Sequence, residues 1–187
     1  MGVLGSLGVS LPRPRLVPGP GAAGQALSWI GDERIAVSGV PLPRMMARLA
    51  EQGVTHVVNC RPHLQVRWWG DLAAERAAFG PRHVAHAPMQ DHGLRQPPAA
   101  WAAAACFAAG VLEDEPQAGV LIHCTAGRRR SVMLAYAVLR LRGHDSTHAA
   151  ALLLQYRVEA MLVPAYVRSV ERWLAPAGPV TPPAAMS

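Results

Sequence analysis

The sequence predicts an α/β domain in which a central mixed or parallel sheet is flanked by helices. Two observations support this fold class. Short apolar runs alternate along the chain with longer segments of helical periodicity, which is typical of strands joined by crossover helices. The last such run is followed by the segment VMLAYAVL, which is apolar nearly all round. A helix of that kind is expected at the centre of a domain, buried on every side.

Four strands are expected, and they share short length and apolar or β-branched residues. In chain order they are 34–38, 55–59, 83–87 and 119–123, of which 83–87 is the weakest. Six helices are expected between and after them, over 42–52, 72–79, 97–112, 131–142, 146–156 and 164–174. Because the last three helices follow one another without a strand, they should cluster on one face of the sheet.

Glycine and proline mark the ends of these helices. Gly53, Gly80 and Gly143 each stand directly after a helical segment, where glycine commonly terminates a helix. Pro97 and Pro98 stand at the start of the alanine-rich helix, where the fixed proline φ is favourable. These positions set the helix boundaries that the sequence predicts.

The chain is expected to fold as one domain, over residues 26–175. Residues 1–25 and 176–187 are rich in Gly, Pro and Ala and are expected to form disordered tails. No apolar run is long enough to span a bilayer, and the N-terminus lacks the pattern of a signal peptide. Three cysteines are too few for a disulfide framework. A cytoplasmic location is therefore expected.

All the basic residues are arginines, and the net charge is +6. A G- and C-rich genome explains much of this bias, and attraction of an anionic substrate is the functional explanation. Few aromatic residues are interleaved with the arginines, which argues against nucleic acid as a partner.

The segment VLIHCTAGRRRS at 120–131 carries the chemistry. A strand ends before Cys124 and a helix begins near Arg130, so the loop between them should direct backbone N–H groups and a helix N-terminus inward, as an anion cradle. Such a field lowers the pKa of a thiol and makes Cys124 a thiolate nucleophile. Arg130 would clamp two phosphate oxygens, and Ser131 would stabilise the sulfur. The loop contacts to substrate are expected from Thr125, Ala126, Gly127, Arg128 and Arg129.

This string matches C-x5-R-[ST] and resembles the signature of the protein tyrosine and dual-specificity phosphatase superfamily. The resemblance covers about 29–174, and the short domain is similar to the compact dual-specificity branch. It implies a general acid on a loop upstream of the cysteine, and Asp91 stands 33 residues before Cys124 with one expected helix between them. Asp71 is the alternative acid, although its place before a helix favours an N-cap.

Three other features of the sequence leave alternatives open. Arg128 and Arg129 either attract a polyanionic substrate or point to solvent or to acids elsewhere. Cys60 ends the strand 55–59; some lipid phosphatases of the superfamily have a reversible disulfide partner there, and the other interpretation is a small buried hydrophobic residue. Cys106 is expected in the core.

The resemblance implies a phosphomonoester hydrolase that forms a phosphocysteine intermediate and needs no metal or cofactor. A phosphorylated protein, on tyrosine, serine or threonine, is the substrate it favours. The same chemistry on a phosphoinositide or a phosphorylated sugar is an alternative. A rhodanese-type sulfurtransferase and a non-catalytic phosphate-binding module are the competing hypotheses.

Overall fold

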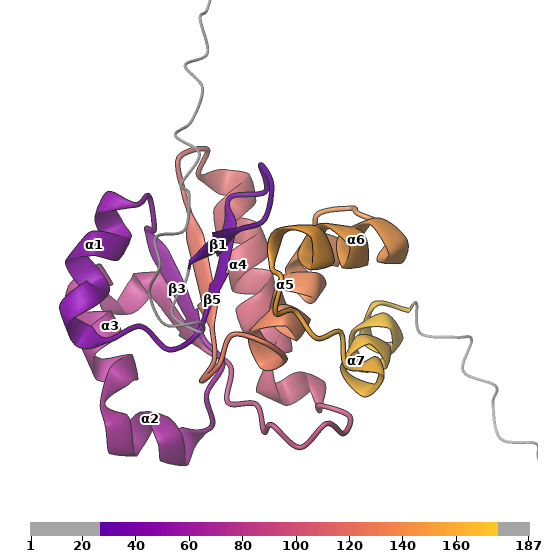
Figure 1. Ribbon diagram of the computed structural model, residues 1–187, viewed down its shortest axis with the longest axis horizontal. Coiled ribbons are helices and arrows are strands. Elements are labelled where there is room, and N and C mark those ends of the chain that lie inside the picture. Colours follow the sequence, from indigo (N-terminus) through magenta and orange to yellow (C-terminus); the bar gives the residue numbers. More distant parts are fainter. Residues whose placement is uncertain (1–26, 176–187) are drawn as a thin grey trace, which may run out of the picture.

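The computed structural model describes residues 27–175, and the two predicted tails lie outside the described residues. Five strands form one sheet in the order β1-β2-β5-β3-β4 (Figure 1). Their bounds are β1 Ser28–Trp29, β2 Ile35–Ser38, β3 His56–Asn59, β4 Val84–His86 and β5 Val120–His123. The short β1 is antiparallel to β2, and all other neighbours are parallel. The sheet is therefore mixed and mostly parallel, as predicted.

The described residues contain seven α-helices and three short 3-10 turns. The helices are α1 Met46–Glu51, α2 His63–Trp69, α3 Asp71–Phe79, α4 Ala102–Asp114, α5 Arg130–Leu141, α6 Ser146–Tyr156 and α7 Pro164–Leu174. The turns are Pro43–Met45, Pro81–His83 and Pro98–Ala100. Each turn has a proline in its first positions, where the missing N–H is tolerated.

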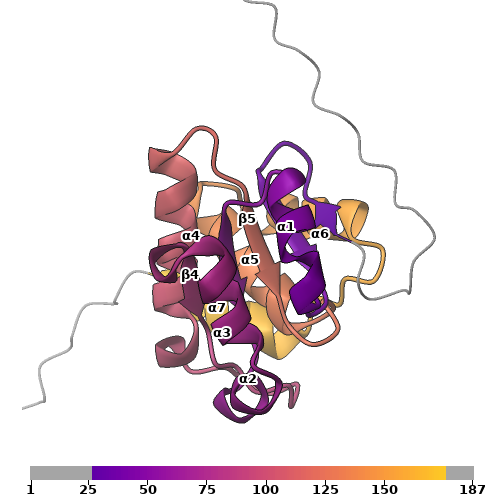
Figure 2. The ribbon, with the colours of Figure 1, turned by 90° about the vertical axis from the view of Figure 1, so that its left-hand side faces the viewer.

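Helices cover both faces of the sheet, so the strands are apolar on both sides. Alternate residues of β5 show the two cores. Leu121 faces a smaller core that contains residues of α1 and the partly buried Leu72 and Phe79 of α3. Val120 and Ile122 face the larger core, which holds α5 and buried residues of α4, α6 and α7. Figure 2 views the molecule from the side of α1 and α3. The predicted cluster of consecutive helices on one face is confirmed.

α5 is buried along nearly its whole length, from Arg130 to Leu139, as its apolar sequence predicts. It contacts β5, β2, α4, α6 and α7. The loop that begins with Cys124, called here the cysteine loop (residues 124–129), ends where α5 begins. Because α5 is buried along nearly its whole length, it holds that end of the loop in place.

The sequence did not predict the strand β1 or the helix α2, and its prediction for the burial of Cys106 was wrong. β1 has only two residues, too few for a periodicity signal. α2 buries Val66 alone, so it lacks the apolar stripe from which a helix is recognised. Cys106 is exposed, which contradicts the expected core position. The reason is its place on α4, where Ala104, Ala105 and Ala108 face the core instead.

Candidate active site

The loop 124–129 joins the end of β5 to the start of α5. Three of its carbonyl groups point away from the loop centre and accept hydrogen bonds from surrounding residues. The Thr125 carbonyl accepts from the Val40 N–H, and the Arg128 carbonyl accepts from the Met161 N–H, at 3.2 and 2.8 Å. The Gly127 carbonyl accepts from Arg157 Nε at 3.2 Å. Because peptide N–H and C=O groups point in opposite directions, this leaves loop N–H groups free to face inward.

Gly127 is required in this loop on two grounds. Its φ of +69° is a conformation that side chains disfavour. A Cβ here would also lie 2.4 Å from the carbonyl carbon of Ser38, which is backbone and cannot move aside cheaply. The loop therefore packs directly on the chain after β2, and the predicted role of Gly127 in its curvature agrees with this geometry.

Cys124 is buried at the centre of the loop. Its Sγ accepts a hydrogen bond from the Gly127 N–H at 3.2 Å and lies 3.4 Å from Ser131 Oγ. Burial by itself raises the pKa of the thiol, but the hydrogen bonds from Ser131 and Gly127 and the Arg130 charge outweigh it, so the pKa of Cys124 is lowered. The surroundings of the sulfur thus favour the thiolate.

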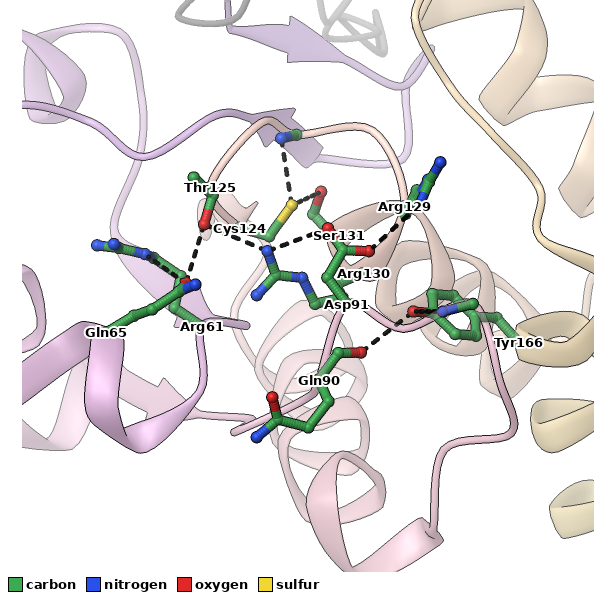
Figure 3. A network of polar contacts seen from close by, with 12 residues as sticks. Arg61, Gln65, Gln90, Asp91, Cys124, Thr125, Arg129, Arg130, Ser131 and Tyr166 are labelled. Carbon is green, nitrogen blue, oxygen red and sulfur yellow. Dashed lines mark hydrogen bonds and ion pairs between the residues drawn. The ribbon is translucent and has the colours of Figure 1, made fainter.

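Arg130 is 2% exposed, and its guanidinium lies between the loop and Asp91 (Figure 3). Its Nη2 donates to Thr125 Oγ1 at 3.2 Å and to Asp91 Oδ2 at 3.4 Å. Its Nε and Nη1 have no hydrogen-bond partner among the described residues. Buried N–H groups normally have partners, so these two donors are available to an anion in the loop.

Asp91 lies on the segment between β4 and α4, called here the acid loop (residues 88–97). Hydrogen bonds from α7 hold this loop in place. Tyr166 Oη donates to the Gln90 carbonyl at 3.1 Å and accepts from the Gly93 N–H at 3.2 Å. Ser169 Oγ accepts from the Gln96 N–H at 3.1 Å. The Asp91 side chain is 41% exposed, so it faces both the loop and solvent.

A buried polar cluster lies behind the cysteine loop. His123 Nε2 lies 2.8 Å from Glu75 Oε1, and both side chains are fully buried. Asn59 Nδ2 donates to both carboxyl oxygens of Glu75 and to Asp71 Oδ2. Arg61 Nη1 lies 2.8 Å from Asp71 Oδ2. The cluster ties β3, β5 and α3 together directly below the loop.

Asp71 therefore has neither of its two expected roles. Its carboxylate is buried and paired with Arg61, rather than free to donate a proton at the loop. The N-cap of α3 is Gly70, and no side chain caps that helix. The interpretation of Asp71 as an N-cap is wrong because the buried Arg61 and Asn59 draw its carboxylate away from the helix N-terminus.

α2 contacts the cysteine loop through Gln65. The Gln65 Oε1 atom accepts from Thr125 Oγ1 at 3.0 Å and from Arg61 Nε at 3.4 Å (Figure 3). Since Thr125 also contacts Arg130, a chain of hydrogen bonds leads from α2 to the guanidinium. The structure thus places α2, a helix that was not predicted, beside the cysteine loop.

Arg128 and Arg129 differ in their surroundings. The Arg129 Nη1 atom lies 3.8 Å from Asp91 Oδ1, and Arg129 also lines a cavity of about 410 Å³ with Gly93 and residues 161–164. Arg128 is exposed, and its carbonyl accepts a hydrogen bond from the Met161 N–H. One arginine therefore faces the acid and the cavity, and the other faces solvent. Ala126, the remaining predicted loop residue, is exposed at the loop surface.

Cys60 lies beside Cys124. Asn59 and His123 are paired in the parallel register of β3 and β5, and the Cys60 N–H donates to the His123 carbonyl at 2.8 Å. Both Cys60 and Cys124 are free thiols in the structure. Burial, and then the nearby Cys124, raise the pKa of Cys60 well above its ordinary value, so it stays protonated. Its role as a redox partner stays a prediction.

Several residues of the site were missed by the sequence analysis. Each lies far along the chain from the residues that it contacts. Gln65 and Arg157 contact the cysteine loop, Tyr166 and Ser169 contact the acid loop, and Glu75 contacts His123 of β5. The sequence signal for Arg157 was its place directly after the apolar helix 146–156. The structure shows that this arginine is buried, and arginine is seldom buried without a specific partner.

Within residues 27–175, no group of three or more His, Cys, Asp or Glu side chains is arranged to hold a metal ion. In the same range, no helix is long and apolar enough to cross a membrane.

The sheet order and the cysteine loop before a buried helix define a class of structure, the compact dual-specificity and tyrosine phosphatase fold. Among solved structures, PTPMT1 in complex with PI(5)P is similar to this chain, with a TM-score of 0.65 and 18% identity over 76% of this chain and 90% of that chain. Tk-PTP in the active form has a TM-score of 0.64 and 20% identity, covering 78% and 94%. Human DUSP28 has a TM-score of 0.62 and 18% identity, covering 84% and 94%.

These similarities confirm the predicted fold, and at such identities they establish the fold alone. No protein-family model matches the chain, and no curated protein sequence matches it.

Proposed function

We propose that residues 26–175 are a phosphatase domain that hydrolyses phosphomonoesters through a phosphocysteine intermediate on Cys124. The observation that carries the proposal is the arrangement of donors around the sulfur. Gly127 N–H and Ser131 contact Sγ, and the buried Nε and Nη1 atoms of Arg130, which have no partner among residues 27–175, are donors in the same small space. A thiolate beside unpaired donors is suited to attack an anion that these donors hold.

In the first step the Cys124 thiolate attacks phosphorus, a sulfur–phosphorus bond forms, and the ester oxygen–phosphorus bond breaks. Asp91 donates its proton to the departing oxygen. In the second step water attacks phosphorus, its proton passes to the Asp91 carboxylate, and the sulfur–phosphorus bond breaks. Ser131, 3.4 Å from Sγ, stabilises the departing thiolate. Arg130 holds the phosphate oxygens through both steps. The reduced thiol that this chemistry needs fits a reducing compartment such as the cytoplasm.

Two substrate classes fit this site. Phosphorylated protein side chains are the substrates expected from the compact dual-specificity resemblance. A phosphoinositide is the second candidate, and the exposed Arg128 of the cysteine loop favours it because additional phosphates would attract an additional arginine. The presence of PI(5)P in a solved structure of the same fold is consistent with that candidate.

Turnover of an aryl phosphate in the presence of a chelator tests the proposal. Cys124→Ser should abolish turnover, and vanadate should inhibit the wild-type protein, because both block the phosphocysteine step. Asp91→Ala should slow substrates with poor leaving groups by about 10²-fold or more and leave good leaving groups less affected, since only poor ones need the proton. Cys106→Ser and Asp114→Ala, on the exposed side of α4, serve as matched controls.

Full turnover by Cys124→Ser would refute the mechanism, and an equal loss for all leaving groups in Asp91→Ala would remove Asp91 from the acid role. Sulfur transfer from thiosulfate to cyanide would instead support the rhodanese-type alternative. Phosphate binding without hydrolysis of any substrate in a broad panel would support the non-catalytic alternative.

A further inference from the structure

α2 exposes three large apolar side chains next to the candidate active site. Leu64 is 71% exposed, Trp68 is 83% exposed and Trp69 is 72% exposed. Gln65 of the same helix contacts the cysteine loop, so these side chains lie at the margin of the pocket. Apolar residues this large are seldom left in water in such number on two turns of one helix.

The three side chains protrude from the part of the chain that the structure describes. About three quarters of each residue is accessible to solvent there, so no described element encloses them in a groove. α2 is held by Val66 beneath it and by the Arg61 guanidinium, which lies 5.4 Å from the centre of the Trp69 ring. Figure 1 shows α2 and the acid loop at the same end of the molecule as the loop between β5 and α5. Leu94 of the acid loop is 66% exposed and adds a further apolar side chain there.

The segments that surround the pocket are strongly basic. Residues 61–71, 88–97, 124–130 and 157–164 together contain seven arginines and three acidic residues. Each of the three acids, Asp71, Asp91 and Glu159, is paired with an arginine. The exposed Arg67 on α2 and Arg95 beside Leu94 add positive charge next to the apolar side chains. The docking end, defined as α2 with Leu94 and Arg95, is therefore both apolar and cationic.

We infer that this docking end binds the surface of an anionic lipid bilayer. Tryptophan and leucine enter the interfacial region of a bilayer, and arginine pairs with anionic headgroups. Protruding side chains suit a soft, planar surface, whereas a peptide would need a groove. A second copy of the chain carries the same positive charge and would be repelled. This inference rests on the proposed function. It deepens that function by naming a phosphomonoester carried by a lipid as the substrate.

Vesicle binding by the full chain tests this inference, measured in the Cys124→Ser variant so that turnover plays no part. Phosphatidylcholine vesicles with and without phosphatidylserine should be compared by co-sedimentation, and tryptophan emission should shift to the blue on binding. The double variant Leu64→Ser/Trp68→Ser should bind anionic vesicles at least about tenfold more weakly, because it removes two side chains from the interface. Leu154→Ser, which alters an exposed leucine of α6, should bind as before.

The same double variant in the otherwise wild-type protein should keep its turnover of a soluble aryl phosphate, which shows that the fold and the site are intact. Equal binding to anionic vesicles by the double variant and its parent would overturn the inference, as would a failure of the parent to bind them. A loss confined to hydrolysis of a phosphotyrosine peptide would also overturn it and would assign α2 to peptide recognition. If aryl phosphate turnover is absent while vesicle binding follows the pattern above, the proposed function fails and the docking surface stands.

Discussion

Cys60 and Cys124 lie side by side at the ends of two paired strands, yet their surroundings act on them in opposite directions. The pKa of Cys124 is lowered because hydrogen bonds and the Arg130 charge outweigh its burial. Burial raises the pKa of Cys60 well above its ordinary value, and the nearby Cys124 adds to that effect. The surroundings therefore favour the thiolate at Cys124 and the protonated thiol at Cys60, and of these two forms the thiolate is the nucleophile.

Alkylation by iodoacetamide should follow this difference. In a Cys106→Ser background, which removes the exposed thiol, the rate of Cys124 alkylation should rise with pH through a midpoint below that of an ordinary thiol. Ser131→Ala should move the midpoint upward, since the thiolate loses a hydrogen bond while the neutral thiol loses little. Mass spectrometry of the labelled peptides gives both results. A midpoint that does not move in Ser131→Ala would show that Ser131 does not stabilise the sulfur.

At the scale of residues, the sequence predicted those functional groups that stand together in the chain. Cys124, Arg130 and Ser131 belong to one continuous string, and a contiguous loop gives a readable pattern. Arg157 contacts Gly127 across 30 residues of chain and Gln65 contacts Thr125 across 60, and no local pattern records such contacts. Their positions follow only from the packing of α2 and the end of α6 against the loop.

At the scale of elements, α7 determines where the acid loop lies. Tyr166 and Ser169 stand about one turn apart on one side of this helix, and both bind backbone groups of the acid loop. α7 is held in turn by Glu171, whose carboxylate binds Arg140 Nε at 2.7 Å and Tyr136 Oη at 2.6 Å on α5. Asp91 is thus positioned through α7 by the same central helix that begins with Arg130.

Tyr166→Phe should release the acid loop without unfolding the domain, because the ring remains buried and only the hydroxyl is lost. Turnover of a substrate with a poor leaving group should fall about tenfold, equivalent to ~1.4 kcal/mol, since Asp91 is less often in place. Reaction of Cys124 with iodoacetamide should be unchanged. Kinetics with two aryl phosphates of different leaving group measure the effect, and an equal loss for both would contradict a role for Tyr166 in placing the acid.

Element prediction from the sequence succeeded where periodicity or glycine and proline signals were strong. The bounds of α6 and α7 agree with the prediction to the residue, and β5 and α5 agree within one residue. α2 was missed because its stability comes from Val66 and from the Arg61 contact, rather than from an apolar stripe. Trp68 and Trp69 of this helix are exposed, so they do not contribute to a periodic pattern of buried apolar residues.

At the scale of the whole molecule, a buried polar cluster links the neighbouring strands β3 and β5 to α3. Glu75 is the centre of this cluster, because it lies against His123 of β5 and accepts hydrogen bonds from Asn59 of β3. Removing one member of a buried polar pair leaves the other group buried without its charge or hydrogen-bond partner, and this strongly destabilises the folded state. The cluster therefore contributes to global stability and to the position of β5, the strand that directly precedes Cys124.

Glu75→Ala should lower the free energy of unfolding by about 3–5 kcal/mol. Glu75→Gln should lower it less, since the amide oxygen still accepts a hydrogen bond. Urea denaturation monitored by circular dichroism measures both, with Glu113→Ala on the exposed surface of α4 as the control. A loss in Glu75→Ala no greater than that of the control would show that the cluster does not support the fold.

The central position of β5 also affects how the protein folds. β5 is inserted between β2 and β3, and Val120 pairs with Ile35 and with His56, which are 85 and 64 residues earlier in the chain. Such a high contact order makes closure of the sheet a slow event, because long chain loops must be closed before any pairing is gained. Until that insertion, Cys124 has neither its helix nor its surrounding amides and reacts as an ordinary thiol. A newly synthesised chain therefore acquires its sensitivity to oxidants only when the middle of its sheet is complete.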